Sequence, residues 1–334
     1  MVVRDLAAWL MAVGILGCGS SGGNGVDGDG TAPSPPPGAG PSLEGCPVFP
    51  ADNIWNRAVD GLPRDGRSDD YVASIGRTAT LHPDFGSGSF DGGPIGIPFV
   101  VVAGSQARVP ILFTAYGDES DPGPYPVPPD APIEGGPRAD GDRHVLAVDR
   151  GACVLYELFR AFPNRDGSWS ADSGARFDLR SHALRPAGWT SADAAGLPIL
   201  PGLVRFDEVA AGEIRHALRF TAPRTRRDYV WPARHVASSR TEAGLPPMGQ
   251  RFRLRASFDL SGFSRETQVV LRALQRYGMM LADNGSAWFL SGAPNPGWND
   301  DALVTEMRRV QGSDFEAVDV SSLMVSPDSG QARP

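Results

Sequence analysis

The sequence contains no lysine: all 31 of its basic residues are arginine. Schiff-base catalysis, pyridoxal phosphate anchoring and the phosphate-binding P-loop each require the primary amine of a lysine, so these mechanisms are excluded. A positive net charge is also missing, because the 334 residues carry a formal net charge of −8. Binding to duplex nucleic acid needs a positive footprint. We therefore expect no nucleic-acid partner.

Signatures of a catalytic metal are missing as well. The five histidines form no His-Glu-x-x-His motif or comparable zinc pattern, and we expect neither a catalytic metal nor an organic cofactor. The one oxygen-rich stretch is the proline-rich segment 117–142, which has no EF-hand spacing but leaves Ca²⁺ open as a ligand. Its acidic residues are Asp118, Glu119, Asp121, Asp130, Glu134, Asp140 and Asp142.

The apolar segment Leu6 to Gly17 is too short to span a bilayer as a helix, which needs about 20 apolar residues. It follows Arg4 and fits the apolar region of a secretory signal. Its end, Ile15-Leu16-Gly17-Cys18, resembles the bacterial lipobox, in which the cysteine is acylated. We predict a lipoprotein signal peptide over residues 1–17, lipidation of Cys18, and a location in the bacterial cell envelope, at the outer membrane or cell surface. An ordinary signal peptide is the alternative.

Residues 18–45 are predicted to form a flexible linker. Of the 27 residues 19–45, 14 are glycine or proline, and such a composition cannot bury enough apolar area to fold. Neither an internal repeat nor a second linker is found in residues 46–323, which we predict to be a single domain. Residues 324–334 are predicted to be a disordered tail, and the protein is expected to be a monomer.

Only three cysteines are present. With Cys18 assigned to the lipid, Cys46 and Cys153 form an even pair in an exported protein, which favours a disulfide. It would close a loop of 107 residues, worth roughly 4 to 5 kcal/mol in the chain-entropy model. Two buried free thiols are the alternative.

The folded part is rich in short β-like runs separated by glycine and proline and poor in helical periodicity. We predict a mainly β domain, a β-sandwich or a barrel-like fold, with a few short peripheral helices. The predicted strands cover residues 97–102, 109–116, 144–149, 154–159, 213–221, 251–258, 279–282 and 287–290. The predicted helices cover residues 69–75 and 191–195, a segment after Ser264 that ends at Gly278, and residues 301–310.

Two hairpins are predicted from turn residues. Asn284-Gly285 between two apolar runs is a strong hairpin signal for strands 279–282 and 287–290. In the second hairpin, a two-residue turn at Arg150-Gly151 would place His144 directly opposite Glu157. A carboxylate beside an imidazole raises its basicity, as a general base requires. A structural ion pair at a sheet end is the alternative.

His216 is the other unusual histidine, since it shares a predicted strand face with apolar residues. It is either a catalytic residue or a hydrogen-bonded residue of the core. For a glycosidase, which needs two carboxylates across a cleft, Glu134 and Glu157 are the candidate catalytic pair. For a lyase, His144 or His216 would act with Tyr156 as base and acid.

Positive charge is concentrated between Arg215 and Arg255, where ten arginines face two acidic residues. Arg251, Arg253 and Arg255 alternate with apolar residues, so we predict one strand face with three guanidinium groups able to grip an anion. A solvated face paired with acidic neighbours is the alternative. Trp231 and His235, in the segment Tyr-Val-Trp-Pro-Ala-Arg-His, are further candidates for substrate binding.

Several sequence segments resemble those of a family of secreted bacterial proteins and lipoproteins. The segments include LHPDFG, DESDPGPYP, GDRHVL, RPAGWTSADAAGLPILPGLVRFDEV, HALRFTAP, YVWPARH and YGMMLADNGS. The resemblance covers nearly all of residues 46–323. It implies a single exported domain, and it implies no activity and no catalytic residue.

These observations lead to one function and one alternative. We predict a surface-anchored lipoprotein that degrades a polysaccharide, as a glycoside hydrolase or a lyase, with an anionic glycan favoured because of the three arginines. The alternative is a non-catalytic carbohydrate-binding or adhesion lipoprotein.

Overall fold

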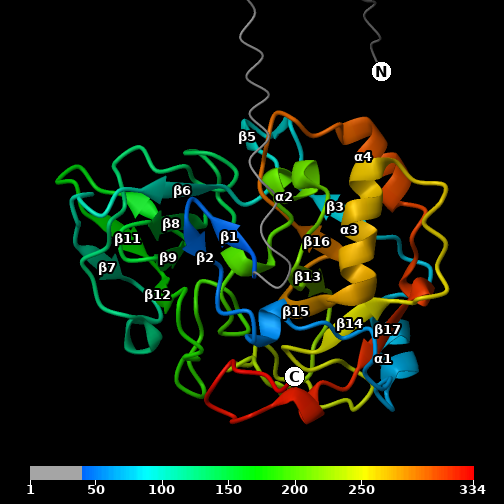
Figure 1. The fold of residues 1–334 in the computed structure, drawn as a ribbon. Helices are drawn as coiled ribbons and strands as arrows, with labels where there is room; N and C mark the ends of the chain where they lie inside the picture. The colour runs from blue at the N-terminus through cyan, green and yellow to red at the C-terminus, as the bar shows by residue number, and fades with distance from the viewer. Residues whose placement is uncertain (1–39) are drawn as a thin grey trace, which may run out of the picture. The chain divides into compact units, whose positions relative to one another are not determined.

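The computed structural model describes residues 40–334 (Figure 1). The predicted signal peptide, the lipidation of Cys18 and most of the predicted linker lie outside the described residues. Strand pairing begins at Ser42, because β1 (Ser42–Leu43) pairs with β2 (Cys46–Pro47). The last residues predicted as linker are therefore part of the folded domain.

The largest sheet has six strands, which makes it the main framework of one half of the domain. In spatial order these are β17 (Phe315–Val318), β14 (Arg251–Leu254), β15 (Met279–Asn284), β13 (Leu218–Ala222), β16 (Phe289–Ser291) and β3 (His82–Asp84). Its helices are α1 (Ser68–Ile75), which packs on β17, α3 (Arg265–Arg276), which packs on β14, and α4 (Asp300–Met307), which packs on β3. The short helix α2 (Phe206–Ala211) packs on α3.

The other half of the domain is built on a sheet of four strands, in the order β12 (Ser173–Asp178), β9 (Val154–Phe159), β8 (Val145–Asp149) and β6 (Phe99–Val102). A three-stranded sheet follows the order β10 (Phe162–Pro163), β11 (Trp169–Ala171) and β7 (Ile111–Phe113). A further two-stranded sheet joins β4 (Ser89–Phe90) to β5 (Gly93–Pro94). Short 3-10 turns lie at Ile54–Asn56, Gly117–Glu119, Leu200–Gly202, Gly312–Asp314 and Ser321–Leu323.

The four-stranded sheet is buried on both faces. Because side chains alternate along a strand, Leu146 and Leu155 point into the main core, which they share with the six-stranded sheet. Ala147 and Leu158 point the other way, into a second core with Trp169 of the three-stranded sheet. The main core therefore joins the two halves of the domain.

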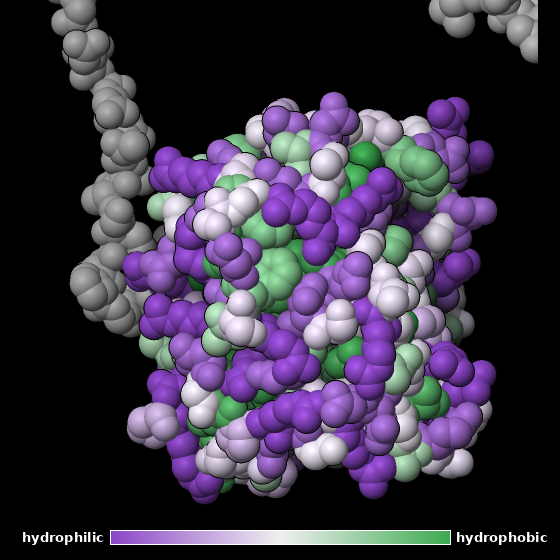
Figure 2. Space-filling view, turned by 90° about the vertical axis from the view of Figure 1, so that its right-hand side faces the viewer, coloured by the Kyte–Doolittle hydropathy of each residue, from purple (hydrophilic) through white to green (hydrophobic). Residues whose placement is uncertain are grey.

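The mainly β character and the small number of short helices are confirmed. The strands form several sheets, and no barrel closes within residues 40–334; the sandwich stays a prediction. No helix in the described part of the chain is both long and apolar enough to cross a membrane. Figure 2 shows a face on which polar side chains dominate and apolar ones are limited to small patches.

The helix after Ser264 is confirmed in detail. The Ser264 hydroxyl accepts a hydrogen bond from the backbone N–H of Thr267, as an N-cap does. The chain leaves the helix through Gly278, whose φ of 65° is the left-handed conformation that glycine adopts readily. The predicted helix 191–195 does not form. The Ser191 hydroxyl instead donates to the carbonyl of Leu197 and accepts the N–H of Asp193, local contacts that compete with helix formation.

The predicted hairpin around Asn284-Gly285 is wrong. Strands β15 and β16 both form, but β13 lies between them, parallel to β15 and antiparallel to β16. The turn itself bonds to β13, since the N–H of Gly285 donates to the carbonyl of Ala222. Pairing with a strand from elsewhere in the chain therefore overrides the local turn signal.

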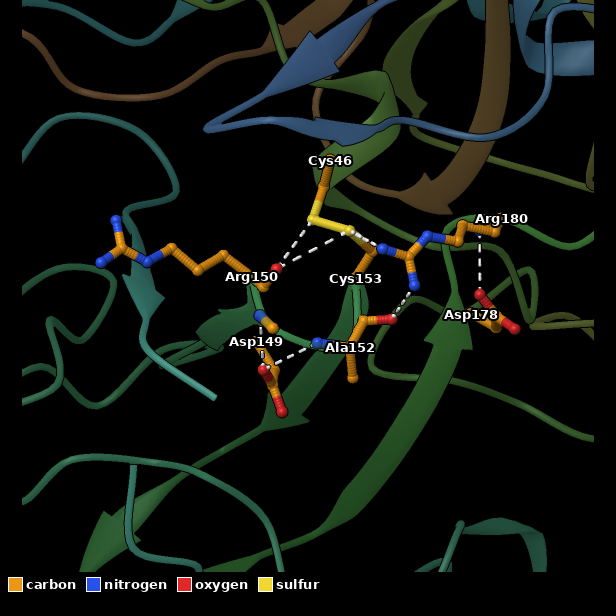
Figure 3. The surroundings of a disulfide bond; sticks show 8 residues. Cys46, Asp149, Arg150, Ala152, Cys153, Asp178 and Arg180 are labelled. Carbon is orange, nitrogen blue, oxygen red and sulfur yellow. Dashed lines mark hydrogen bonds between the residues drawn. A yellow bond between two sulfur atoms is a disulfide. The ribbon is translucent and has the colours of Figure 1, made fainter. Parts of the chain in front are cut away.

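The disulfide between Cys46 and Cys153 is confirmed, with the two Cα atoms 5.4 Å apart. It ties β2, at the start of the domain, to the turn between β8 and β9 (Figure 3). The Arg180 guanidinium reaches the Cys153 sulfur at 3.0 Å and donates to the carbonyl of Ala152. The Asp149 carboxylate accepts two N–H groups of the same turn.

That turn has four residues, Arg150 to Cys153, and the predicted two-residue turn is wrong. Leu146 lies opposite Glu157, and Asp149 lies opposite Val154, so the predicted pairing is shifted by two residues. A shift of two keeps every side chain on its face. His144 and Glu157 therefore share a face but do not lie directly opposite each other.

Residues 324–334 differ from the predicted disordered tail, because they make specific contacts with the domain. Gln331 forms a bridge with Asn53, and its side chain donates to Asp52. The carbonyl of Ser329 accepts the indole N–H of Trp231. These last residues thus form part of the domain surface.

Candidate functional site

A cleft of about 480 Å³ lies where the two halves of the domain meet. Phe159 of β9 contributes one part of its lining, and Asp283 of β15 contributes another. Asp142, from the loop before β8, and the loop residues Asp193 and His235 also line the cleft and carry ionisable groups.

Asp193, which lines the cleft, forms a buried ion pair with Arg219. The two Asp193 oxygens accept from Nε and Nη2 of Arg219 at 2.7 and 2.8 Å, and Arg219 Nη1 donates to the Ser291 hydroxyl at 2.6 Å. Both charged side chains are almost completely buried. Bidentate pairing of this kind fixes both side chains.

Asp283 lies next to this pair, and its carboxylate is only partly neutralised by Arg219. Its carboxylate is 3.6 Å from Arg219 Nη2, and 24% of the side chain is exposed. Burial, followed by the negative charge of Asp193, raises the pKa of Asp283 to about 7, although Arg219 opposes the shift; Asp142 adds a smaller repulsion. Asp283 therefore keeps its proton to a higher pH than an ordinary aspartate does, as a general acid requires.

His235 faces the same cleft with a defined tautomer. Its Nδ1 lies 2.8 Å from the carbonyl of Ala194, and because a carbonyl only accepts, Nδ1 carries the proton. Nε2 lies 3.9 Å from the Glu119 carboxylate, which itself accepts the N–H of Thr190. His235, which the sequence suggested as a substrate-binding residue, thus lines the cleft.

Glu134 and His144 form an ion pair behind the cleft. Nδ1 of His144 lies 2.6 Å from Glu134 Oε2, and Nε2 lies 3.0 Å from the carbonyl of Ala192. Burial alone would lower the pKa of His144, but Glu134 outweighs burial and raises it to about 9. Nε2 must donate to the carbonyl, and Nδ1 is occupied by the Glu134 carboxylate, so neither nitrogen is available for the predicted role of general base.

Together with Asp142, this pair forms the only candidate metal centre among the described residues. Glu134, Asp142 and His144 offer ligand atoms within 4.8 Å of one another. A metal ion would have to replace an existing partner of His144, because both ring nitrogens are already hydrogen-bonded. The histidine of this donor set is therefore satisfied from within the protein, whereas the Asp142 carboxylate is exposed.

Glu157 lies outside the cleft, which corrects its predicted position beside the substrate. It is fully buried and accepts the N–H groups of Ile199 and Leu200 at 2.9 to 3.0 Å. Burial raises the pKa of Glu157 to about 7, against the lowering effect of these two N–H groups. Its contacts give it a structural role, holding the loop at residues 199–200.

Tyr156 and His216 also lie away from the cleft. Tyr156 points into the second core, where its hydroxyl accepts a hydrogen bond from Arg108 at 2.7 Å. His216 precedes β13 and is fully buried; its Nε2 lies 2.9 Å from Glu208. Glu208 in turn pairs with Arg205 at 3.0 Å. Tyr156 and His216 therefore share no site in which they could act together as the predicted acid and base.

The three predicted anion-binding arginines do not form an open strip. Arg251 is buried and donates to the carbonyls of Tyr277 and Ile54. Arg253 and Arg255 share the carboxylate of Glu316 on β17. The predicted alternation of arginine and apolar residues is present. However, β14 lies between β17 and β15, and its guanidinium groups bind backbone carbonyls and the Glu316 carboxylate.

Trp231 lines a different hollow, of about 450 Å³, together with Tyr229, Val320 and Met324. Arg234 also lines this second hollow, whereas the next residue, His235, lines the cleft. Trp231 and His235, grouped together by the sequence, thus belong to two neighbouring hollows. In the following, "cleft" means the Asp283 site and "Trp231 hollow" the second one.

Sequence reasoning missed Asp193 and Asp283, which line the cleft, and Arg219, which pairs with both carboxylates. They come from a loop and from two strands that are adjacent only in space. Comparisons with protein-family models, curated proteins and solved structures give no match.

Proposed function

We propose that the protein hydrolyses glycosidic bonds of a polysaccharide in the cleft. One observation carries the proposal: Asp283, with a pKa of about 7, shares the cleft with the exposed carboxylate of Asp142. The two residues come from different halves of the domain. Glycosidases place two carboxyl groups around the scissile bond, one protonated and one ionised.

In the proposed reaction, Asp283 donates its proton to the glycosidic oxygen as the bond from that oxygen to C1 breaks. A water molecule attacks C1, and Asp142 accepts its proton. The products are one sugar with a new reducing end and one with a free hydroxyl. Arg219 and Asp193 position Asp283, while His235 offers a hydrogen-bonding group to the substrate.

Charge favours hydrolysis over β-elimination. A lyase acting on a uronate needs a cation to neutralise the sugar carboxylate, but Arg219 is already neutralised by Asp193. Arg251 and Arg253 are bound by carbonyls and Glu316 in the six-stranded sheet. We therefore favour a neutral glycan as the substrate over the anionic glycan that the sequence pattern indicated. The proposal keeps the lipid-anchored envelope location.

A screen of neutral and anionic polysaccharides for new reducing ends and for unsaturated uronates tests the proposal. We expect reducing ends from a neutral polymer, no ultraviolet-absorbing uronate product, and loss of release in Asp283→Asn. Release of unsaturated products would identify a lyase and contradict the mechanism. Binding of a polymer without any release would favour the non-catalytic alternative.

A further inference from the structure

We propose that the Trp231 hollow is a second sugar-binding subsite for the polymer that is cut in the cleft, an inference that rests on the proposed function. The hollow has about the volume of the cleft, 450 against 480 Å³. Its wall combines a flat aromatic ring with charged side chains. That combination suits a sugar, whose ring face is apolar and whose edge carries hydroxyls.

The aromatic wall is held in place. The indole N–H of Trp231 donates to the carbonyl of Ser329 at 2.8 Å, so the polar edge of the ring is bound by the protein. The ring packs against the core that contains Val318 and Val320. Partly exposed Met324 continues the apolar wall. A rigid, partly exposed ring binds a flat apolar surface with little loss of conformational entropy.

The polar rim is built from a fixed pair, Arg234 and Asp328. Arg234 is buried and donates to the carbonyls of Arg185 and Pro327, while its third nitrogen donates to Asp328 at 2.6 Å. The Asp328 side chain is 77% exposed, which leaves its second oxygen free to accept from a sugar hydroxyl. Asp319 adds another carboxylate to the lining.

The position of the Trp231 hollow favours, as its occupant, the same polymer that is proposed to be cut in the cleft. Arg234 and His235 are consecutive, and the first lines the hollow while the second lines the cleft. The carbonyl of Arg234 accepts the N–H of Gly188, and Gly188 stands between Ala187 of the hollow and Thr190 of the cleft. Two neighbouring chain segments thus contribute to both sites, and in this proposal one extended glycan occupies the two sites together.

Affinity electrophoresis of an inactive variant tests the subsite. Asp283→Asn protein is run on native gels that contain hydroxyethylcellulose, glycol chitin or arabinoxylan. We expect at least one polymer to slow this variant, and adding Trp231→Ala to weaken the apparent affinity at least tenfold. The control adds Phe90→Ala instead; Phe90 is 79% exposed and lines neither site. This control should be slowed like its parent.

A second variant protects the test against misfolding. If circular dichroism shows that Trp231→Ala is unfolded, Asp328→Ala replaces it, because this exposed side chain is at the rim. In addition, binding should change the tryptophan fluorescence of Asp283→Asn protein, and Trp231→Phe should remove most of that change. Unchanged retardation in both Trp231→Ala and Asp328→Ala, or no retardation by any polymer, would overturn the subsite.

The two proposals fail in different ways. If a polymer is hydrolysed by the unmodified protein but the Trp231 variants bind it normally, the subsite is wrong and the hydrolase stands. If retardation depends on Trp231 but no polymer yields reducing ends, the subsite stands as a binding site and the hydrolase is wrong.

Discussion

The cleft and strand β14 both bring several charged groups together, but they satisfy them to different degrees. On β14, Arg251 and Arg253 are held by backbone carbonyls and by Glu316. In the cleft, Arg219 satisfies Asp193 fully and Asp283 only in part. The carboxyl group that is left incompletely paired, and not the densest run of charge, marks the candidate site.

The difference has an electrostatic cause. Arg251 has no carboxylate partner within residues 40–334, and burial lowers its pKa to about 9, so its charge is maintained by carbonyl dipoles. Asp283 lies beside another carboxylate, and burial and repulsion make its neutral form accessible near pH 7. A group whose two protonation states are close in free energy can transfer a proton, whereas a permanently paired group cannot.

The largest expected effect is on activity. Asp283→Asn should lower kcat by about 10²- to 10⁴-fold, the range that general acid catalysis supplies. In the unmodified protein, activity should fall as the pH rises above about 7, because Asp283 loses its proton. Measurement of reducing ends across pH checks both statements.

Glu157→Gln is the matched control for that prediction. Glu157 has a pKa raised to about 7 as well, but it is sealed inside the domain. Its amide replacement can still accept the N–H groups of Ile199 and Leu200, so kcat should change less than threefold or so. A large loss of kcat in a folded Glu157→Gln protein would make Glu157 catalytic and remove the distinction between the two carboxyls.

Arg251→Ala should lower the free energy of unfolding by roughly 3 to 5 kcal/mol, because it opens a cavity and leaves two buried carbonyls without donors. Urea denaturation measures this change. Hydrolysis per folded molecule should stay the same. A stable Arg251→Ala protein that loses glycan binding would show that β14 holds a ligand after all.

The ion pair of Glu134 and His144 should stabilise the protein within a defined pH window. The pKa of His144 rises from 6.5 to about 9 on folding, which corresponds to about 3 kcal/mol at 1.36 kcal/mol per unit. This stabilisation is fully present below 6.5 and is lost as the pH rises through 9. On the acid side, Glu134 has a lowered pKa, so its contribution is lost when it protonates below its ordinary value of 4.5.

Thermal unfolding from pH 7 to pH 10 checks this window. The unmodified protein should lose stability relative to His144→Gln, whose amide keeps a polar side chain at the site but has no proton to lose. Parallel pH profiles for the two proteins would mean that His144 is neutral in the folded state.

The smallest expected effect is that of Arg255→Ala. Its side chain is 38% exposed and pairs with Glu316, which keeps Arg253 as a partner. Exposed ion pairs contribute about 0.2 to 1 kcal/mol, so urea denaturation should show a loss within that range. A loss as large as that of Arg251→Ala would remove the difference between the buried and exposed ends of the strand.

Local and compositional signals predicted part of this fold correctly. The Ser264 cap, the strand 154–159 and the even cysteine pair depend on neighbouring residues or on counting, and all three are found. The register of β8 and β9 was missed, because a turn of four residues replaces one of two. The turn residues alone do not reveal the longer turn, because it depends on a disulfide to the distant Cys46 as well as on the Asp149 side chain.

The centre of the candidate site could not be predicted for a related reason. Asp193 and Arg219 become partners only because β13 inserts between β15 and β16, an arrangement that the Asn284-Gly285 signal argued against. The arginines of β14 show the reverse error: their alternation was read correctly, but alternation defines a face and does not say whether another part of the protein covers it.

The disulfide also determines how the domain would respond to a mechanical load. A pull on the chain from the N-terminal side reaches Ser42 first and would peel β1 from β2, which pair over only two residues. At Cys46 the force passes through the covalent link to Cys153 and into the turn that follows the fully buried strand β8. A tether could therefore strain the entry hairpin without transmitting the load along the next 107 residues.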